Sequence, residues 1–446
     1  MMAKRLSATT RSARAWAVLS VTLLTFVTSG SAGAFEVVLS TQGEYMDGYL
    51  VNGKAFPPRV IVNDPDPHPA DSLTTPPYIG GRHLNGKVCF FPSQVTQRPL
   101  PRVEDGGRSS AISDRVIPSN PPRRRGYVVA DDEYREACLD PKPPQARCSV
   151  TNPSSPFFVG KSLDGWAVFD LAGRWTRQHI QVQGEPAVDQ NNDPQGAKDP
   201  QGCAFLPDGR LLATDVGSEI TGVSDGALMV FFPGGAHGGY DSYCFLDKGL
   251  ADPGMPALDD AGNIYVPESQ ALRITKFSPP YPSSPADCAN PELLVTTPPR
   301  KSTWLESGVG GLTIPVSITR ARTSDHFYVA GVLAPPIINE YDANGAFVRN
   351  IVPANVPKNP IGMDVGRDGT LYYAELNLDP MTSSPRCGSV SMVQFDAAGN
   401  PQTPVTLGIH LQFPDGITVV DSSELRIPFK QLRPSPDIPA SECGGE

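Results

Sequence analysis

Three segments of the chain end in a carboxylate at the same position of a shared pattern. The segments LLATD, IYVPE and LYYAE end at Asp215, Glu268 and Glu375. Carboxylates that lie close together raise one another's pKa or recruit a cation, and Ca²⁺ and Mg²⁺ prefer six or more oxygen ligands. The pattern therefore points to acid–base chemistry or to a hard-cation site, wherever the three acids meet.

Further oxygen-bearing side chains stand near the start of each segment. From both sets we predict catalytic residues, ligand-binding residues and ligands for Ca²⁺ or another divalent cation. The predicted catalytic residues are Glu375 and Glu268, the ligand-binding residues are Asp199, Asp215 and Asp252, and the metal ligands are Asp415, Gln201 and Asn359. The competing interpretation is structural, because an acid at a strand end caps a turn by accepting hydrogen bonds from backbone N–H groups.

Other catalytic signatures are absent from the sequence. None of the six histidines has a metal-ligand spacing, although His237 lies between glycines in GGAHGGY and is expected to be accessible. No G-x-S-x-G, P-loop or G-x-G-x-x-G pattern occurs. Hydrolase-elbow, nucleotide-binding and dinucleotide-binding functions therefore lack support.

The candidate residues belong to five segments that repeat one pattern of turn, apolar strand, tight polar turn and second apolar strand. The segments are DPQGCAFLPDGRLLATD (199–215), DPGMPALDDAGNIYVPE (252–268), GGLTIPVSITRARTSDHFYVAG (310–331), NPIGMDVGRDGTLYYAE (359–375) and FPDGITVVDSSELRIP (413–428). Helical patterns of useful length are absent, and a repeat of this size made of strands and turns indicates a β-propeller. We predict an all-β, six-bladed β-propeller, with seven blades as the alternative.

The last segment lacks an outer hairpin, so we expect N-terminal strands to close the last blade, with NGKVCFFPSQ (85–94) among them. A weaker copy predicts a first blade at 106–183, with inner strands at 106–116 and 126–132. The predicted parts are a signal peptide (1–34), an N-terminal segment with the closing strands (35–105), the propeller (106–428) with an insert (133–162), and a Pro-rich tail (429–446).

Propeller geometry assigns the candidate residues to one face. The first strand of each blade lines the central channel and begins at the face where the second strand ends. The acids that end the second strands therefore share one channel mouth with the residues that begin the first strands, with few Lys or Arg between them. We expect a small-molecule or protein ligand to bind at this acidic mouth.

The start of the chain has the features of a secretory signal. A basic stretch precedes the apolar run AWAVLSVTLLTFV (15–27) and Ala32-Gly33-Ala34. Eight cysteines follow, which suggests up to four disulfides, with Cys138 and Cys148 as the best local pair. We predict a secreted or periplasmic monomer with no membrane span, and the net charge of −10 disfavours a nucleic-acid partner.

The unit P-x-G-h-x-h-x-x-D-G-x-h-h-h-A-[DE], in which h is apolar, resembles NHL repeats. It is also similar to the six-bladed propellers of the senescence-marker/gluconolactonase, paraoxonase and strictosidine-synthase-like group, clearly over 199–428 and weakly over 106–183. The resemblance implies a divalent ion in the channel, held by Glu, Asn and Asp just before the first strands. Asp415, in Pro414-Asp415-Gly416-Ile417, matches the Asp-Gly element. The Asn-Gly and Glu elements have no match, and Gln201 would be a weaker, neutral ligand.

Three functional classes are compatible with these residues. The preferred class is a propeller that binds a small molecule or protein at the acidic mouth, with a Ca²⁺-like ion. A metal-dependent lactonase or esterase would use the ion as a Lewis acid and Glu375 or Glu268 as general base. A structural protein of the export compartment would use neither. A fold does not choose among functions, so whether the protein is an enzyme stays open.

Overall fold

The computed structural model is built almost wholly from β-strands. It describes residues 36–42, 45–50, 59–62, 84–91, 126–131, 165–170, 175–180, 187–188, 194–195, 200–217, 222–233, 240, 242–289, 293–333, 335–377, 388–411, 414–421 and 432–433. The helical elements in these ranges are two 3-10 turns, η2 (Pro285–Asp287) and η3 (Val309–Gly311). Within the same ranges, no helix is long and apolar enough to cross a membrane.

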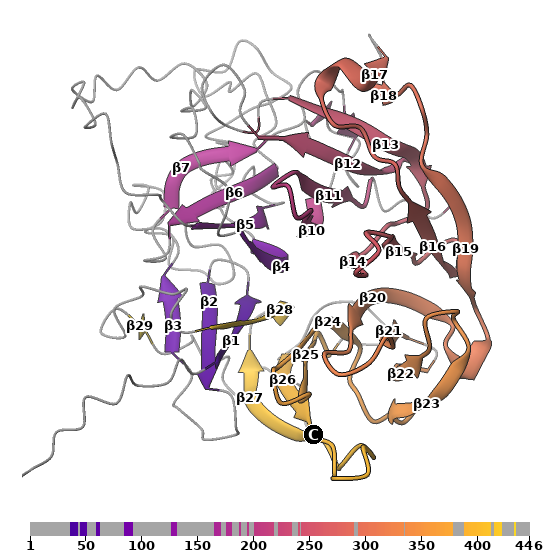
Figure 1. The fold of residues 1–446 in the computed structure, drawn as a ribbon. Coiled ribbons are helices and arrows are strands. Elements are labelled where there is room, and N and C mark those ends of the chain that lie inside the picture. Colours follow the sequence, from indigo (N-terminus) through magenta and orange to yellow (C-terminus); the bar gives the residue numbers. More distant parts are fainter. Residues whose placement is uncertain are drawn as a thin grey trace, which may run out of the picture. The chain divides into compact units, whose positions relative to one another are not determined.

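Five blades are each built on four antiparallel strands of one stretch of chain (Figure 1). The first two are β4 (Leu84–Phe90), β5 (Gly126–Asp131), β6 (Gly165–Asp170) and β7 (Trp175–Ile180), followed by β10 (Pro200–Phe205), β11 (Leu211–Asp215), β12 (Gly226–Phe232) and β13 (Ser242–Leu250). The third is β14 (Ala257–Leu258), β15 (Ile264–Glu268), β16 (Arg273–Ser278) and β19 (Arg300–Glu306). The last two are β20 (Ile314–Arg320), β21 (Phe327–Val332), β22 (Ile337–Tyr341) and β23 (Phe347–Val352), then β24 (Pro360–Val365), β25 (Leu371–Glu375), β26 (Gly388–Val393) and β27 (Val405–Leu411). In the second blade, β18 (Leu294–Val295) and β17 (Cys288–Ala289) extend the sheet beyond the fourth strand, and β18 pairs with that strand in parallel.

The two ends of the propeller chain share one further sheet. Its order is β28 (Pro414–Asp421), β1 (Glu36–Gln42), β2 (Tyr45–Leu50), β3 (Arg59–Val62) and β29 (Leu432–Arg433). The antiparallel pairing of β28 with β1, in register at Val38 and Val419, is the closure by an N-terminal strand that the repeat predicts. The predicted count of six or seven blades was wrong, because the propeller has five blades, and the further sheet, which β28 and the N-terminal strands build together, closes the circuit between the last blade and the first.

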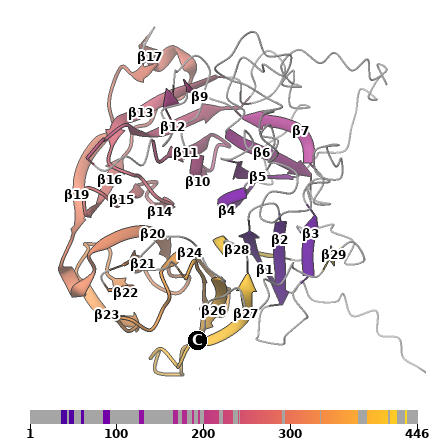
Figure 2. The same ribbon diagram turned by 180° about the vertical axis from the view of Figure 1, so that it is seen from behind.

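The inner strands of neighbouring sheets contact one another in a closed circuit. Strand β4 contacts β10, β14 contacts β20, β20 contacts β24, β24 contacts β28, and β28 contacts β4. The link from β10 to β14 is made at Gly202, which lies directly against Met255 and Pro256. Figure 2 shows the same arrangement from behind. A closed circuit of antiparallel sheets with their first strands innermost defines a β-propeller.

The role predicted for 85–94 was wrong. This segment contains β4, which is the inner strand of the first blade and pairs with β5, for example Cys89 with Val128. The inner strand predicted at 106–116 lies outside the described residues, as do the signal peptide, the insert at 133–162 and most of the tail. The sequence pattern misplaced β4 because the chain between β4 and β5 is long, which hides their pairing.

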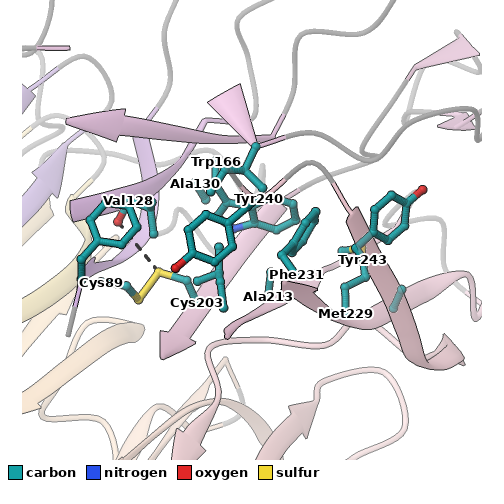
Figure 3. Packing of buried hydrophobic residues seen from close by; sticks show 14 of the residues in the cluster. Cys89, Val128, Ala130, Trp166, Cys203, Ala213, Met229, Phe231, Tyr240 and Tyr243 are labelled. Atoms are coloured by element: carbon teal, nitrogen blue, oxygen red, sulfur yellow. Dashed lines mark hydrogen bonds between the residues drawn. A yellow bond between two sulfur atoms is a disulfide. The ribbon is translucent and has the colours of Figure 1, made fainter. Parts of the chain in front are cut away.

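The core lies between neighbouring blades. Strands β11, β15 and β25 are buried at every position, because each sheet is covered on both faces by the next sheets of the circuit. Between the first two blades, the Trp166 ring meets the Phe231 ring edge-on at 5.5 Å, and Tyr243 lies 5.2 Å from Phe231 (Figure 3). Such aromatic contacts add to the free energy of burial.

Candidate functional site

Glu268 ends β15 and is bound within its own blade. Its side chain is 1% exposed, and it accepts hydrogen bonds from the Arg273 guanidinium (3.0 and 3.2 Å), the Ala251 N–H (3.2 Å) and the Thr275 hydroxyl. Burial by itself raises the pKa of Glu268, but the hydrogen bonds from Arg273 and Thr275 outweigh it and leave the pKa below its ordinary value. A carboxylate held in this way is an anchor between strands β15 and β16.

Glu375 ends β25 in the same manner. It is buried and accepts hydrogen bonds from the Ser389 hydroxyl (2.6 Å), the Ser391 hydroxyl (3.0 Å) and the Lys358 N–H (2.8 Å). The two serines belong to β26 and Lys358 to the segment before β24, so Glu375 joins three parts of one blade. Its donors satisfy the carboxylate, which favours the structural interpretation over the role of general base.

The predicted ligand-binding acids also lie at strand ends. Asp215 ends β11 and accepts the Gly217 N–H at 3.0 Å. Asp252 precedes β14 with φ 58°, and its carbonyl accepts the Ser269 N–H at 2.9 Å. Asp199 lies outside the described residues. The sequence therefore located Asp215 and Asp252 near the strand ends correctly, and these two hydrogen bonds join residues of the same blade.

Two of the predicted metal ligands, Asp415 and Asn359, accept hydrogen bonds between blades. Asp415 is fully buried and accepts the Gly86 N–H, while the Asn359 side chain accepts the Leu333 N–H at 2.9 Å. Gln201 is half-buried on β10. In the part of the chain that the structure describes, no group of three or more His, Cys, Asp or Glu side chains could hold a metal ion. The role of Asp415, Gln201 and Asn359 as cation ligands stays a prediction from the sequence.

The inner strands are closely packed at the end of the channel where they begin. A Cβ at Gly86 would overlap the Gln201 carbonyl of the next blade, and one at Gly416 would overlap the Gly86 carbonyl. The Thr41 hydroxyl bridges two of these strands. It donates to the Gly86 carbonyl (2.9 Å) and accepts the Gly416 N–H (2.7 Å). Backbone therefore lies against backbone where these inner strands begin.

The other end of the channel contains a cavity of about 930 Å³. Its walls come from the inner strands of all six sheets in the circuit. The lining residues are 87–90, 203–207, 256–258, 260, 318–322, 364, 367 and 418–420. Most sets fall in the later part of their inner strand or just beyond it, whereas 256–258 covers the short strand β14 and the residue before it. None of the seven predicted site residues that the structure describes is among them.

The cavity wall is charged as well as apolar. Lys87 lies 3.2 Å from Asp364, Arg320 contacts Asp260, and Arg322 and Arg367 complete the charged lining. Sequence reasoning missed these residues because it followed the acids at the opposite strand ends. The available signal was the recurrence of arginine just after a first strand, in ITRAR (318–322) and GRDG (366–369).

A disulfide between two blades forms part of the cavity wall. Cys89 on β4 and Cys203 on β10 are bonded with a Cα–Cα distance of 6.0 Å, beside the Tyr240 ring (Figure 3). A second disulfide joins Cys244 on β13 to Cys288 at the start of β17 (Cys288–Ala289). The predicted pair Cys138–Cys148 lies outside the described residues.

The chain is similar at low identity to several solved structures. No protein-family profile and no curated protein sequence matches the chain. The matched structures include virginiamycin B lyase from Staphylococcus aureus, at 13% identity and TM-score 0.32, over 50% of this chain and 64% of that chain. The calcium-binding protein regucalcin from Agrobacterium tumefaciens matches at 16% and 0.30, over 48% and 63%. A proposed 6-phosphogluconolactonase from Bacteroides fragilis matches at 11% and 0.40, over 88% and 99%.

This chain thus spans just under two thirds of the lyase and regucalcin structures. At these identities and TM-scores, the likenesses carry no argument about the activity of this chain. The description of the fold as a β-propeller depends on the sheet order and on the circuit of inner strands.

Replacing Glu268 with Gln is expected to lower the free energy of unfolding by about 2 kcal/mol at neutral pH, because the charged acceptor of Arg273 is lost. The folded-state pKa lies below the ordinary value of 4.5. The charge therefore stabilises the fold fully above the unfolded pKa, and this stabilisation disappears as the pH falls through the folded pKa. Urea unfolding from neutral pH to about pH 3 should show the variant approaching the unsubstituted protein.

The matched control is Glu306→Gln. Glu306 is an exposed carboxylate directly across from Arg273 in the register of β16 and β19. Its loss should change the stability by about 0.5 kcal/mol or less. Equal effects of the two substitutions at every pH would contradict the anchoring role of Glu268.

Proposed function

We propose that the protein is a binding propeller that holds a small molecule in the cavity at the later ends of its inner strands. The observation that carries the proposal is the cavity itself, whose volume of about 930 Å³ falls within the range of small-molecule sites. Its wall combines apolar side chains such as Val88, Ala204 and Ile318 with a few charged groups. That combination both excludes water from a ligand and orients it.

The proposal keeps the functional class favoured by the sequence and moves the site to the opposite end of the channel. Glu268 and Glu375 already accept several hydrogen bonds each from their own blades. Neither is therefore supported as a general base, and the hydrolase alternative has no candidate base among them. The divalent cation, the protein ligand and the monomeric state stay predictions from the sequence.

We further propose that the protein works in an oxidising compartment, either secreted or periplasmic. The support is the pair of disulfides, Cys89–Cys203 and Cys244–Cys288, because such bonds persist where thiols are not kept reduced. The signal-like start of the chain agrees with this localisation.

The cavity can be tested with phenylnaphthylamine, an uncharged apolar dye whose fluorescence rises on binding. We expect saturable binding with a stoichiometry of one dye per chain. The variant Ala204→Trp places a large ring at the cavity wall and should reduce the affinity at least about tenfold, because the space is filled.

The matched control, Val405→Trp, adds the same ring to an exposed position on β27, where the side chain is 47% exposed. It should bind the dye as the unsubstituted protein does. Dye binding that Ala204→Trp leaves unchanged, while the variant melts at the usual temperature, would show that the cavity is not the site.

A further inference from the structure

We infer that the cavity is selective for an anionic ligand, one that carries a carboxylate, phosphate or sulfonate group on an apolar body. This inference rests on the proposed function, since it assigns the ligand class of the same cavity. It depends on the number of charges in the wall, on their partners and on how rigidly they are held.

Among the residues of the wall that the structure describes, basic side chains outnumber acidic ones. Lys87, Arg320, Arg322 and Arg367 line the cavity, against Asp260 and Asp364. The whole chain has the opposite balance, with a net charge of −10. A basic cavity in an acidic protein concentrates positive potential in the channel and attracts small anions from solution.

Both acids of the wall are already engaged by the protein. Asp364 contacts Lys87 at 3.2 Å and accepts the Val419 N–H at 2.8 Å, which joins three inner strands. Asp260 is engaged by Arg320, and the hydrogen bond from this guanidinium holds the pKa of Asp260 below its ordinary value. Lys87 and Arg320 therefore offset the charges of Asp364 and Asp260.

The arginines are held in place by the fold. Arg320 lies between Asp260 and Asp325 and donates to Asp325 at 2.8 Å. Arg322 donates through Nε to the Val365 carbonyl at 3.0 Å, across the boundary between β20 and β24. A neutral carbonyl orients the guanidinium without cancelling its charge. A preorganised guanidinium loses little entropy on binding, and its planar fork matches carboxylate or phosphate oxygens.

The wall beside these groups is apolar. Ala204, Leu206, Ile318 and Val420 line the same cavity. An inorganic ion alone would leave that surface in contact with water, whereas an anion on an apolar ring system would cover it. The ligand class that fits is therefore an amphipathic organic anion.

The experiment compares two dyes that differ by one charge. Anilinonaphthalene sulfonate carries a sulfonate on the ring system of the uncharged phenylnaphthylamine. We expect the sulfonate to bind about tenfold more tightly, with an affinity that falls as the salt concentration rises. Arg322→Gln and Arg367→Gln should each reduce the affinity for the sulfonate about tenfold and leave the affinity for the neutral dye unchanged.

The matched control is Arg300→Gln, which removes an exposed arginine from the outer strand β19, outside the cavity. It should change neither affinity. The variant Ala204→Trp should weaken both dyes, which places them in the cavity. Melting temperatures close to that of the unsubstituted protein establish that the variants are folded.

Different results would overturn the proposed binding site and its preference for anions. Equal affinities for both dyes, unaffected by the arginine substitutions, would overturn the anionic preference and leave the cavity as a binding site. Sulfonate binding that resists Ala204→Trp but responds to Arg300→Gln would assign the anion to the outer surface and overturn the inference. Binding of neither dye would overturn both proposals.

Discussion

Gly86→Ala is expected to be the most damaging single substitution, with a loss of about 4 kcal/mol in the free energy of unfolding. Gly86 lies on the inner strand β4 with φ 65°, a conformation that costs energy for any residue with a Cβ. The added Cβ would also overlap the Gln201 carbonyl of the next blade. Because that neighbour is backbone on another inner strand, the overlap is relieved only by moving two blades apart.

The variant Gly369→Ala separates the cost of positive φ from the cost of the overlap with the next blade. Gly369 also has positive φ, at 85°, but an added Cβ there meets nothing within 4 Å. Only the conformational cost applies, so we expect a loss of about 1 kcal/mol. Urea unfolding of the two variants measures the difference. Equal losses would show that the inner strands do not need the close contact at Gly86.

Loss of the disulfide Cys89–Cys203 is expected to cost about 4 kcal/mol and to weaken dye binding in the cavity. The bond joins residues 114 apart in the sequence, so breaking it releases a long loop in the unfolded chain. It also connects β4 to β10 at the cavity wall. The double variant Cys89→Ala, Cys203→Ala removes the bond without leaving a polar group in the wall.

The double variant Cys244→Ala, Cys288→Ala is the matched control. Its bond spans 44 residues and lies in the outer part of one sheet. The shorter loop should make its loss about 1 kcal/mol smaller, and dye binding should be unchanged. Urea unfolding and phenylnaphthylamine titration of both double variants provide the measurements. Retained dye affinity in the first variant would show that the wall does not depend on the covalent link.

Much of the fold was predictable from local patterns. The paired strands β10–β11, β15, β20–β21 and β24–β25 coincide with the repeated segments, because alternating apolar residues and glycine turns specify strands and hairpins locally. The closing contact of β28 with β1 followed from the missing outer hairpin of the last segment. The position of β4 was not predictable in the same way, because its partner β5 lies far along the chain.

The candidate site was predicted less well than the fold. Asp215, Glu268 and Glu375 do end equivalent strands, as the spacing indicated. Their hydrogen-bond partners lie outside the repeated pattern, however. Arg273 and Thr275 lie on the strand after Glu268. Ser389 and Ser391 lie on the strand after Glu375. A carboxylate whose partners lie outside the repeated pattern becomes a structural anchor once its donors are in place.

Residues close together in the chain specify the strands, turns and antiparallel order of the repeated segments, so these features could be predicted from the sequence. Where the inner strands touch and where they surround a cavity depends on the tertiary structure. At the early end, glycines such as Gly86 and Gly416 let inner strands from distant segments touch through their backbones. At the later end, side chains as far apart in sequence as Lys87, Arg322 and Val420 surround a cavity. Both outcomes follow from packing between blades, which no single repeat contains.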